Sequence, residues 1–440
     1  MKKTIKNKTR GLALFSLISF FLFFLTVPLQ TASAAESEAP TIAAKAAFAC
    51  DEKTGKIFFD QNGETPLGIA SMTKILSMYL VYDALKAGTI TETDQVPISS
   101  DLATLSQDNE LSNVPLYPET TYTVKDLMNA TMVVSANAAI MALAEKISGS
   151  QSAFIDAMRT KLGQLGIQDA NIITVSGLDN DSLPETLRYP NSSAEDQNTM
   201  SAKDVALIAR HLIQDYPQIL ELSKQAKATF AEGTHESIEM TNWNVLLPGL
   251  ALGKEGVDGL KTGTTDDAGA CFVGTKVSGD SHMITVVMNA SNQAADTNAR
   301  FVETAKLMDY VTSDWKQTSI NELHPTLKKH TIDVYGGKSP SVKLIASSAE
   351  DIWIEGNQAP TFHEQLERTH LNKDNKLVAP FNKNETVGTL TVETSDKLGY
   401  LEASDAHKAE VKIVTEKGVE RANPFERLVQ WVKQWIDELF

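Results

Sequence analysis

The sequence contains very little cysteine: only Cys50 and Cys271 in a chain of 440 residues. So few cysteines exclude a disulfide-stabilised scaffold. No candidate base stands beside either of them in the sequence, which argues against a nucleophilic thiol. We expect both to be small hydrophobic residues buried on strands.

Positive charge is also scarce. The chain has 40 lysine and arginine residues against 56 aspartate and glutamate residues, which gives a formal net charge of −16. A surface this acidic argues against nucleic-acid binding, because a polyanion would be repelled.

Patterns for metals and nucleotides are missing as well. The stretch HESIE at His235 lacks the second histidine of a zinc-binding helix, and DNDSLP at Asp179 lacks the glycine and the distal glutamate of a calcium-binding loop. No glycine-rich phosphate loop is present, which argues against nucleotide chemistry. We therefore expect no metal and no cofactor.

The first 34 residues have the pattern of a secretory signal peptide. Residues 1–10 carry five basic side chains and no acidic one, residues 11–29 are almost all apolar, and small residues end the segment. We predict cleavage after Ala34, with an uncleaved anchor as the alternative. The body is exported in either case, and its net charge moves from −16 to −21 because five positive charges leave.

The pattern of residues 36–320 predicts an α+β domain in which helices pack on an antiparallel sheet. A Thr123-x-x-Asp126 capping box marks one helix start, and the polar, aperiodic residues 171–198 are expected to form a long surface loop. The remaining expected elements are two strands around the turn at 53–55, a buried helix from IASMTK to Gly88, a helical pair within 123–147, helices over 202–215 and 216–224, three strands within 256–290, and a helix over 299–310.

The pattern changes near residue 325. Short alternating runs separated by glycine, asparagine and aspartate predict a small β-sandwich domain over 325–418. The tail at 422–440 is expected to form an amphipathic helix lying in a membrane interface, with packing on a domain or partner helix as the alternative. Its charged residues exclude a spanning role. Its apolar stripe consists of Phe425, Leu428, Val429, Val432, Trp435, Ile436, Leu439 and Phe440, with Trp431 at the edge.

The stretch IASMTKILSMYL places Ser71 three residues before Lys74 at the start of the buried helix. Positions i and i+3 of a helix share a face, so the serine Oγ and the lysine Nζ can meet. A lysine can take the proton of a serine hydroxyl if burial and a second cation lower its pKa. A single Ser-x-x-Lys is common by chance, however, and by itself indicates a solvated helix pair.

Two further motifs change this interpretation. Ser-Ala-Asn at 135–137 lies at a helix–helix junction, and Lys-Thr-Gly at 261–263 lies on an expected strand edge. Together with the first motif they form the signature of penicillin-binding proteins and class A β-lactamases. The chain therefore resembles the penicillin-binding serine D,D-peptidase superfamily. Within it, the segments SAN, GLKTGTTDDAG and VAPFNKNETVGTLTV, the leader and the amphipathic tail are most similar to the low-molecular-weight, S11-like D-alanyl-D-alanine carboxypeptidases.

The resemblance implies a fold, an activity and residue roles. The enzyme would remove the terminal D-alanine from peptidoglycan stem pentapeptides, and β-lactam antibiotics would acylate it. Ser71 would attack the carbonyl between two D-alanines while Lys74 accepts its proton. Ser135 would pass a proton to the leaving amine, and Asn137 would hold the substrate amide and help to fix Lys74.

The third motif is implied to bind the substrate. Lys261 would supply positive potential, Thr262 a hydroxyl for the terminal carboxylate, and Gly263 room for a bound chain beside the strand. The backbone N–H groups of Ser71 and Thr264 would form an oxyanion hole, worth a few kcal/mol.

Electrostatics are consistent with these roles. Two lysines near each other disfavour charging both, so Lys261 would help to keep Lys74 neutral, as a base must be. The nearby Arg300 either assists the carboxylate or is an ordinary helix-surface arginine. In the superfamily's usual sheet order another strand separates Cys50 from Cys271, which argues against a disulfide between them.

Rival functions remain open. A class A β-lactamase would need a Glu-x-x-x-Asn motif between the second and third motifs, but Tyr189 follows Glu185 and Thr199 follows Glu195 at that spacing. D,D-endopeptidase or transpeptidase activity is an alternative, as is a non-catalytic penicillin sensor, although no partner domain for a sensor is visible. The expected location is the outer face of the cytoplasmic membrane or the cell wall.

Overall fold

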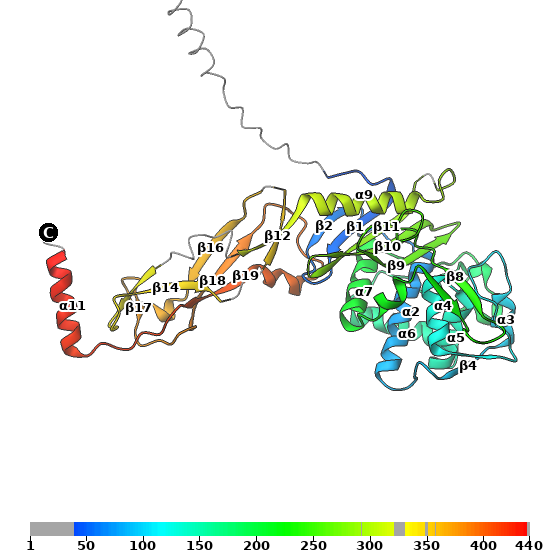
Figure 1. Cartoon of the computed structure of the whole chain (residues 1–440), viewed down its shortest axis with the longest axis horizontal. Coiled ribbons are helices and arrows are strands. Elements are labelled where there is room, and N and C mark those ends of the chain that lie inside the picture. Colours follow the sequence, from blue (N-terminus) through cyan, green and yellow to red (C-terminus); the bar gives the residue numbers. More distant parts are fainter. Residues whose placement is uncertain (1–38, 292, 321–330, 348–350, 357, 438–440) are drawn as a thin grey trace, which may run out of the picture. The chain divides into compact units, whose positions relative to one another are not determined.

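The computed structural model describes residues 39–437 except residues 292, 321–330, 348–350 and 357 (Figure 1). The predicted signal peptide and the last three residues of the predicted tail helix therefore lie outside the described residues.

The first region contains an antiparallel five-stranded sheet in the order β2-β1-β11-β10-β9. The predicted strand pair around the turn at 53–55 and the three predicted strands within 256–290 are all confirmed. The strands are β1 (Ala44–Asp51), β2 (Ile57–Gln61), β9 (Val257–Thr265), β10 (Gly269–Ser278) and β11 (Ser281–Ala290). Because β9 ends the order, the Lys-Thr-Gly motif lies on an edge strand, as predicted.

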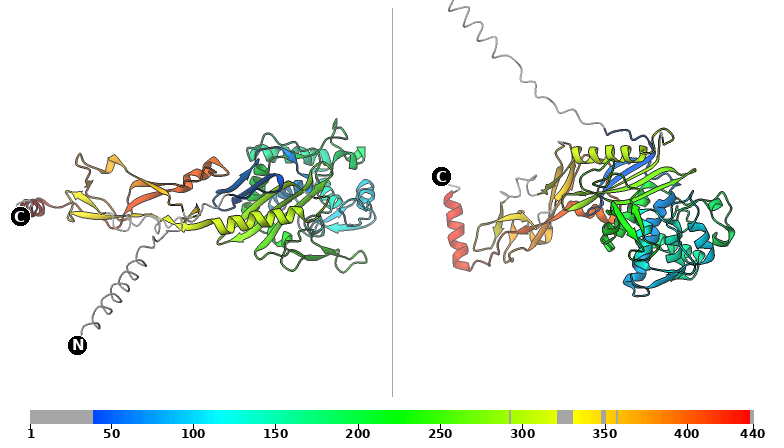
Figure 2. Two further views of the ribbon diagram at one scale, coloured as in Figure 1. Left: turned by 90° about the horizontal axis from the view of Figure 1, so that it is seen from above. Right: turned by 45° about the vertical axis from the view of Figure 1, so that its right-hand side comes forward.

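Helices cover both faces of this sheet. Helix α9 packs on one face with Phe272 and Val287, while α7 packs on the other, where Phe48 and Val273 belong to the core that also includes α2 (Figures 1 and 2). The helices of this region are α2 (Lys74–Lys86), α3 (Ser100–Ser106), α4 (Val124–Val133), α5 (Asn137–Ser148), α6 (Gln151–Gln164), α7 (Ala202–Asp215), α8 (Ile219–Ser223) and α9 (Ala299–Asp314). This alternation of layers confirms the predicted α+β class.

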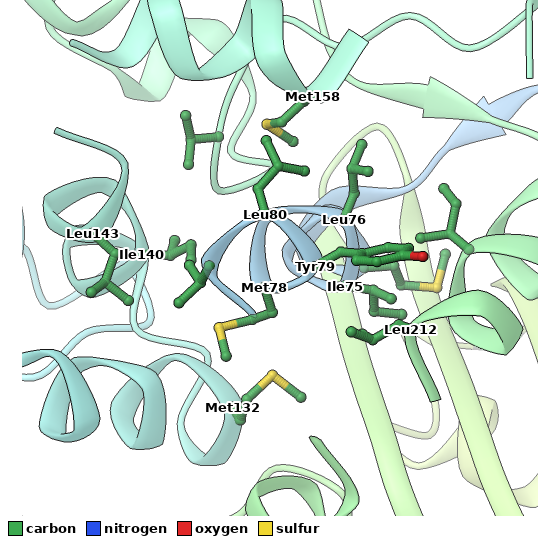
Figure 3. Packing of buried hydrophobic residues seen from close by; sticks show 14 of the residues in the cluster. Ile75, Leu76, Met78, Tyr79, Leu80, Met132, Ile140, Leu143, Met158 and Leu212 are labelled. Carbon is green, nitrogen blue, oxygen red and sulfur yellow. The ribbon is translucent and has the colours of Figure 1, made fainter. Parts of the chain in front are cut away.

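Helix α2 is buried on all sides, as predicted. Figure 3 shows Met78, Leu80 and Tyr79 directed toward different neighbouring elements. Burying each large apolar side chain contributes about 1.5–3 kcal/mol. The helix ends where Gly88, at φ +70°, donates its N–H to the carbonyl of Leu85, which is the predicted C-terminal cap.

The helix start at Thr123 is also confirmed. The Thr123 Oγ1 accepts a hydrogen bond from the Asp126 N–H at 3.0 Å, which satisfies one of the free N–H groups at the start of α4. The Asp126 carboxylate accepts from the Thr123 hydroxyl at 2.5 Å rather than from its backbone N–H, so the box is closed between side chains.

Residues 171–198 differ from the prediction. They form a long connection with two short 3-10 helices, η3 (Asn180–Ser182) and η4 (Glu185–Leu187), but residues 172–178 are buried and not on the surface. Side-chain hydrogen bonds to their backbone replace those of a regular element, which is why no period marks them.

The first region also contains three short pairs of strands: β3 (Leu67–Gly68) with β6 (Thr199–Met200), β4 (Gln95–Pro97) with β5 (Thr121–Thr123), and β7 (Lys227–Phe230) with β8 (Ile238–Thr241).

The second region is built from strands. A six-stranded sheet has the order β16-β18-β19-β14-β13-β17, and β12 pairs with β15. The strands are β12 (Trp315–Ser319), β13 (Thr331–Tyr335), β14 (Ser341–Ala346), β15 (Asp351–Glu355), β16 (Thr361–Leu366), β17 (Leu377–Val378), β18 (Thr386–Glu393) and β19 (Glu410–Thr415). Their alternating apolar side chains, including Val342, Leu390 and Ile413, form a separate core.

Buried ion pairs join the two regions. The Lys56 Nζ lies 2.5 Å from a carboxylate oxygen of Asp396, and both side chains are almost fully buried. Arg210 of α7 donates to both carboxylate oxygens of Asp405, at 2.7 and 3.0 Å. Phe58 of β2 packs on Trp353 of β15 with ring centroids 4.9 Å apart.

Within the tail, residues Pro424–Asp437 form helix α11. Five apolar side chains of its predicted stripe are exposed in the chain: Phe425, Leu428, Val429, Val432 and Ile436. Within the described ranges, none of the helices has the length and apolar character that crossing a membrane requires.

Candidate active site

Ser71 and Lys74 come from a tight turn that leads into α2. Ser71 lies in the 3-10 helix η2 (Ala70–Thr73), and Lys74 is the first residue of α2, so the serine precedes the α-helix that was predicted to carry both. Ala70 has φ +45°, a conformation that costs a non-glycine residue about 1–3 kcal/mol. The turn brings the Lys74 Nζ to 2.7 Å from the Ser71 Oγ.

Lys74 is buried, and no carboxylate pairs with it among the residues that the structure describes. Its Nζ has three hydrogen-bond acceptors at 2.7 Å: the Ser71 Oγ, the Asn137 Oδ1 and the backbone carbonyl of Ser176. Burial, followed by the charge of Lys261, lowers the pKa of Lys74 well below its usual value. A neutral amine has two N–H donors and one lone pair. If the donors go to Asn137 and Ser176, the lone pair points to the Ser71 hydroxyl.

The Ser-Ala-Asn motif forms the junction between α4 and α5, as predicted. Ser135 is in the left-handed region at φ +61°, and its Oγ accepts a hydrogen bond from the Lys261 Nζ at 2.9 Å. Asn137 donates its Nδ2 to the carbonyl of Ser112 at 3.0 Å, which leaves its Oδ1 turned to Lys74. The site thus contains two serine–lysine pairs.

The Lys-Thr-Gly motif brings β9 against the nucleophile turn. A Cβ on Gly263 would lie 2.8 Å from the Ile69 carbonyl oxygen and 3.1 Å from the Met72 nitrogen, so only glycine allows this approach. Gly263 is therefore needed for packing of the enzyme itself, besides the predicted access of a bound chain. Burial, followed by the charge of Arg300, lowers the pKa of Lys261 to about 7.

Arg300 is buried and does not lie on the helix surface. Its Nη1 donates to the carbonyl oxygens of Gly263 at 2.7 Å and Cys271 at 3.2 Å, while its Nε has no partner in the described chain. The helix-surface interpretation of Arg300 is therefore wrong. The guanidinium adds a cation beside β9, and its partners in the described part of the chain are carbonyl oxygens, not carboxylates.

These residues border a pocket of about 390 Å³. The exposed Trp243 stands at its edge and donates its indole N–H to the carbonyl of Val134, next to Ser135. The pocket is lined by Ser71, Ser112, Ser135, Trp243, Val245, Thr262, Gly263, Thr264, Gln293, Thr297, Asn298, Arg300 and Phe301. Lys74, Asn137 and Lys261 lie behind this lining, buried.

All eight predicted site residues thus gather around one pocket or directly behind it. Sequence reasoning missed Ser112, Trp243 and the carbonyl of Ser176. A backbone carbonyl gives no residue-type signal, and Trp243 lies in a segment without a motif.

The two cysteines lie where they were predicted. Both are buried and free, on β1 and β10, and β11 separates their strands. Burial raises the pKa of Cys271 to about 11, so its thiol stays protonated at neutral pH. No group of three or more metal-ligating side chains occurs among the residues that the structure describes.

Chemically, the site can carry out nucleophilic acyl transfer to an anionic substrate. Ser71 has a buried amine at hydrogen-bond distance, Ser135 of the second serine–lysine pair lines the same pocket, and Lys261 and Arg300 supply positive potential. A nucleophile and a base held within about 2.6–3.2 Å are the expected geometry for this reaction class.

Comparisons with known proteins agree with this chemistry. The D-alanyl-D-alanine carboxypeptidase family (peptidase S11) matches residues 32–292. D-alanyl-D-alanine carboxypeptidase DacC of Escherichia coli (strain K12) is 32% identical over 381 residues, which cover 86% of this chain and 87% of that protein.

Two solved structures extend the likeness to the fold. Penicillin-binding protein 3 of Streptococcus pneumoniae, described as a peptidoglycan synthesis regulatory factor, has a TM-score of 0.69 at 40% identity and covers 87% of this chain and 100% of its own. Penicillin-binding protein D2 of Listeria monocytogenes in its ampicillin-bound form has a TM-score of 0.50 at 26% identity and covers 62% of this chain and 98% of its own. The family match spans more than half of the chain and includes all three motifs, and on this evidence the chain belongs to the serine-type D-alanyl-D-alanine carboxypeptidase family, peptidase S11.

Proposed function

We propose that this chain removes the terminal D-alanine from peptidoglycan stem peptides that end in D-Ala-D-Ala. The observation that carries the proposal is the buried Lys74 Nζ, held 2.7 Å from the Ser71 Oγ with its other two acceptors in place. The family membership supports the same reaction.

In the proposed acylation step, the Ser71 Oγ bonds to the carbonyl carbon between the two D-alanines, and its proton moves to the Lys74 Nζ. The N–H groups of Ser71 and Thr264 stabilise the negative oxygen of the tetrahedral intermediate. The C–N bond then breaks, and the proton that Lys74 took from Ser71 passes through the Ser135 hydroxyl, which Lys261 holds by a hydrogen bond, to the leaving D-alanine nitrogen, so Lys74 is neutral again. Water bonds to the ester carbonyl carbon and gives one proton to Lys74, and Lys74 returns that proton to the Ser71 oxygen as the acyl C–O bond breaks.

The proposed carboxylate site combines Lys261, Thr262 and Arg300. The substrate ends in a carboxylate, and these side chains offer cations and a hydroxyl at one wall of the pocket. Asn137 would hold the substrate amide with the Nδ2 hydrogen that Ser112 does not use. An overall acidic chain thus presents positive potential where an anion has to bind.

The decisive experiment measures D-alanine released from a peptide ending in L-Lys-D-Ala-D-Ala by the full chain. We expect release by the wild type, background release by Ser71→Ala, and wild-type release by the exposed control Ser100→Ala. Release by Ser71→Ala at the wild-type rate would overturn the proposal. No release, with a penicillin adduct at Ser71, would instead favour a sensor or a transpeptidase.

We further propose that β-lactam antibiotics inhibit the enzyme by acylating Ser71. A strained amide followed by a carboxylate matches the same nucleophile and the same cationic wall. Intact-protein mass spectrometry should show one penicillin added to the wild type and none added to Ser71→Ala. Rapid loss of the adduct would point to β-lactamase activity.

We propose that α11 binds a membrane interface. Its exposed Phe425, Leu428 and Val432 support this, because a helix with one apolar and one polar face gains free energy by burying the apolar face at a lipid surface. In flotation with zwitterionic vesicles, the full chain should rise with the lipid. The double variant Leu428→Glu, Val432→Glu should stay in the lipid-free bottom fraction, whereas the polar-face control Arg427→Gln should float with the vesicles. Flotation of the double variant would exclude this anchor.

We propose that the protein is exported and that its signal peptide is cleaved after Ala34. Export would bring the enzyme to its peptidoglycan substrate and to the membrane surface that α11 binds. Mass spectrometry of the mature chain from cells gives its first residue. A chain that still begins at Met1 would favour an uncleaved anchor, and retention of the chain in the cytoplasm would contradict export.

A further inference from the structure

The carbonyl that helps to orient Lys74 belongs to an irregular segment, residues 172–178, packed along α2. Its contacts with α2 include the Lys74 Nζ, which donates to the Ser176 carbonyl, and the Ser77 Oγ, which donates to the Val175 carbonyl at 2.6 Å. Gly177 lets the segment pack against the turn before α2. Its φ is +81°, and a Cβ at this position would lie 1.9 Å from the Ala70 carbonyl oxygen. No helix or strand hydrogen bonds fix the path of this segment.

The side chain of Asn198 supplies the missing hydrogen bonds. Its Oδ1 accepts from the N–H groups of Ile173 at 2.7 Å and Thr174 at 3.0 Å. Its Nδ2 donates to the carbonyl of Thr174 and to the Oγ1 of Thr73, both at 2.9 Å. Asn198 is only 2% exposed, so every bond of the carboxamide is made to the protein in a site without competing solvent.

These four bonds connect two parts of the catalytic machinery. Three of them hold the segment that leads to Ser176, and the fourth holds Thr73, which lies in η2 between Ser71 and Lys74. The backbone carbonyl of Asn198 also accepts from the Ile69 N–H at 3.1 Å, just before η2. One residue therefore sets the separation between the nucleophile turn and the segment carrying the Ser176 carbonyl.

That separation controls the lone pair of Lys74. A neutral lysine with both N–H groups bound to Asn137 and Ser176 has only the lone pair left for Ser71. If the Ser176 carbonyl moves away, the amine can rotate and point an N–H at the Ser71 Oγ. In that orientation the lone pair no longer faces the hydroxyl, so Lys74 cannot accept the serine proton. A displacement of about 1 Å in such a contact can cost about 100-fold in rate.

We propose that Asn198 is a positioning residue: it fixes the Ser176 carbonyl against the η2 turn and thereby directs the lone pair of Lys74 to Ser71. The inference rests on the proposed function, in which Ser71 is the nucleophile and Lys74 the base. Asn198 itself touches neither residue's reacting atom.

The main variant is Asn198→Asp, which keeps the size and the acceptor Oδ1 but replaces the Nδ2 donor by an oxygen. That oxygen faces the carbonyl of Thr174 and repels it. The matched control is Asn180→Asp: Asn180 is equally buried in the same long connection, and its Nδ2 donates to Ser192 and Ser193, away from α2.

The measurement is single-turnover acylation of the full chain by a fluorescent penicillin. The amplitude of complete labelling gives the number of competent sites. The maximal acylation rate is then expressed per competent site, so it does not depend on how much of the protein is folded. The half-saturating penicillin concentration is obtained separately. We expect Asn198→Asp to lower the maximal rate about 10–100-fold with an unchanged half-saturating concentration. Asn180→Asp should stay within about twofold of wild type, whatever its stability.

A purely structural role would lower the number of competent sites and leave the rate per site unchanged, and that result would overturn the proposal. An equal loss of rate in Asn180→Asp would overturn it too. If Asn198→Asp does not fold, Thr73→Val tests the proposal, because it removes only the hydroxyl to which the Asn198 Nδ2 donates. A wild-type acylation rate per site in this variant refutes the proposal, and a several-fold lower rate supports it. Failure of the wild type to label at Ser71 would refute the proposed function instead.

Discussion

The two regions of the molecule bury different kinds of side chain. The first region buries Lys74 and Lys261, and their partners within the described residues are hydroxyl, amide and carbonyl groups and no carboxylate. In the described part of the second region, between residues 331 and 419, the buried polar side chains are those of Asp396, Asp405 and Thr415. Lys56 neutralises Asp396, and Arg210 neutralises Asp405.

This difference indicates that the buried charges of the second region serve the stability of the fold, whereas those around the pocket of the first region serve the proposed chemistry. A buried, unneutralised lysine is costly to fold, and in the proposed mechanism this cost serves the chemistry, because Lys74 must be a neutral amine to act as the base. The second region has an apolar core and directs its buried carboxylates to the first region, where they pair with Lys56 and Arg210. Four predictions test this division, from the largest expected effect to the smallest.

The largest effect should follow from Lys74→Met. The substitution keeps the chain length but removes the base, so acylation of Ser71 by penicillin should fall about 1,000-fold. Stopped-flow acylation measures this, and circular dichroism checks that the variant is folded. The exposed Lys125→Met is the control. A variant within tenfold of the wild type would show that Lys74 is not the base.

Asp405→Ala should destabilise the chain while leaving the site intact. It removes the two-point partner of the buried Arg210 guanidinium and leaves Glu402 as its remaining carboxylate partner, so the loss should lie near the low end of the range for a broken buried pair, about 3 kcal/mol. Urea unfolding gives the free energy, and the acylation rate at 25 °C should equal that of the wild type. Glu420→Ala, which breaks an exposed ion pair with Lys338, should change neither. A slow but folded Asp405→Ala would mean that the second region influences catalysis.

A pH dependence should distinguish the two lysines. The pKa of Lys261 is lowered to about 7, so the side chain is a cation below that pH and loses its charge above it. For a peptide with a free carboxylate, kcat/KM should therefore fall about tenfold per pH unit at higher pH. The same peptide with a C-terminal amide should lack this decrease. Because the charge of Arg300 also lowers this pKa, Arg300→Gln should move the decrease to higher pH; an unmoved decrease would assign it to another group.

The smallest effect should follow from Thr123→Ala. It removes the side-chain acceptor at the start of α4 and should cost about 1 kcal/mol of unfolding free energy. Acylation should not change, although α4 leads directly to Ser135. Thr104→Ala in α3, an exposed threonine that is not a cap, serves as the control in the same urea titration. A loss of acylation would show that α4 needs its full stability to hold Ser135.

Much of the first region could be predicted because its signals are local. The period of Ile75, Met78 and Tyr79 indicated α2, the capping pair at Thr123 marked α4, and alternating apolar residues marked the strands. The three motifs identified seven of the eight site residues from a short pattern of residue types, and the eighth, Thr264, directly follows the third motif.

The rest depended on contacts that no local pattern carries. The buried path of residues 172–178 is held by single side chains such as Asn198 and Ser77, so it was mistaken for a surface loop. The burial of Arg300 depends on carbonyls of β9 and β10, which are distant in sequence. The pairing of β12 with β15 is equally nonlocal.

The two buried cysteines have a practical consequence. Both are fully covered by the protein, and burial raises the pKa of each thiol, so neither offers a thiolate to alkylating reagents at neutral pH. A single cysteine engineered at the exposed Trp243 would therefore react selectively with maleimide probes in the folded enzyme. A dye attached there could report in real time on ligands entering and leaving the pocket, without first removing the native thiols.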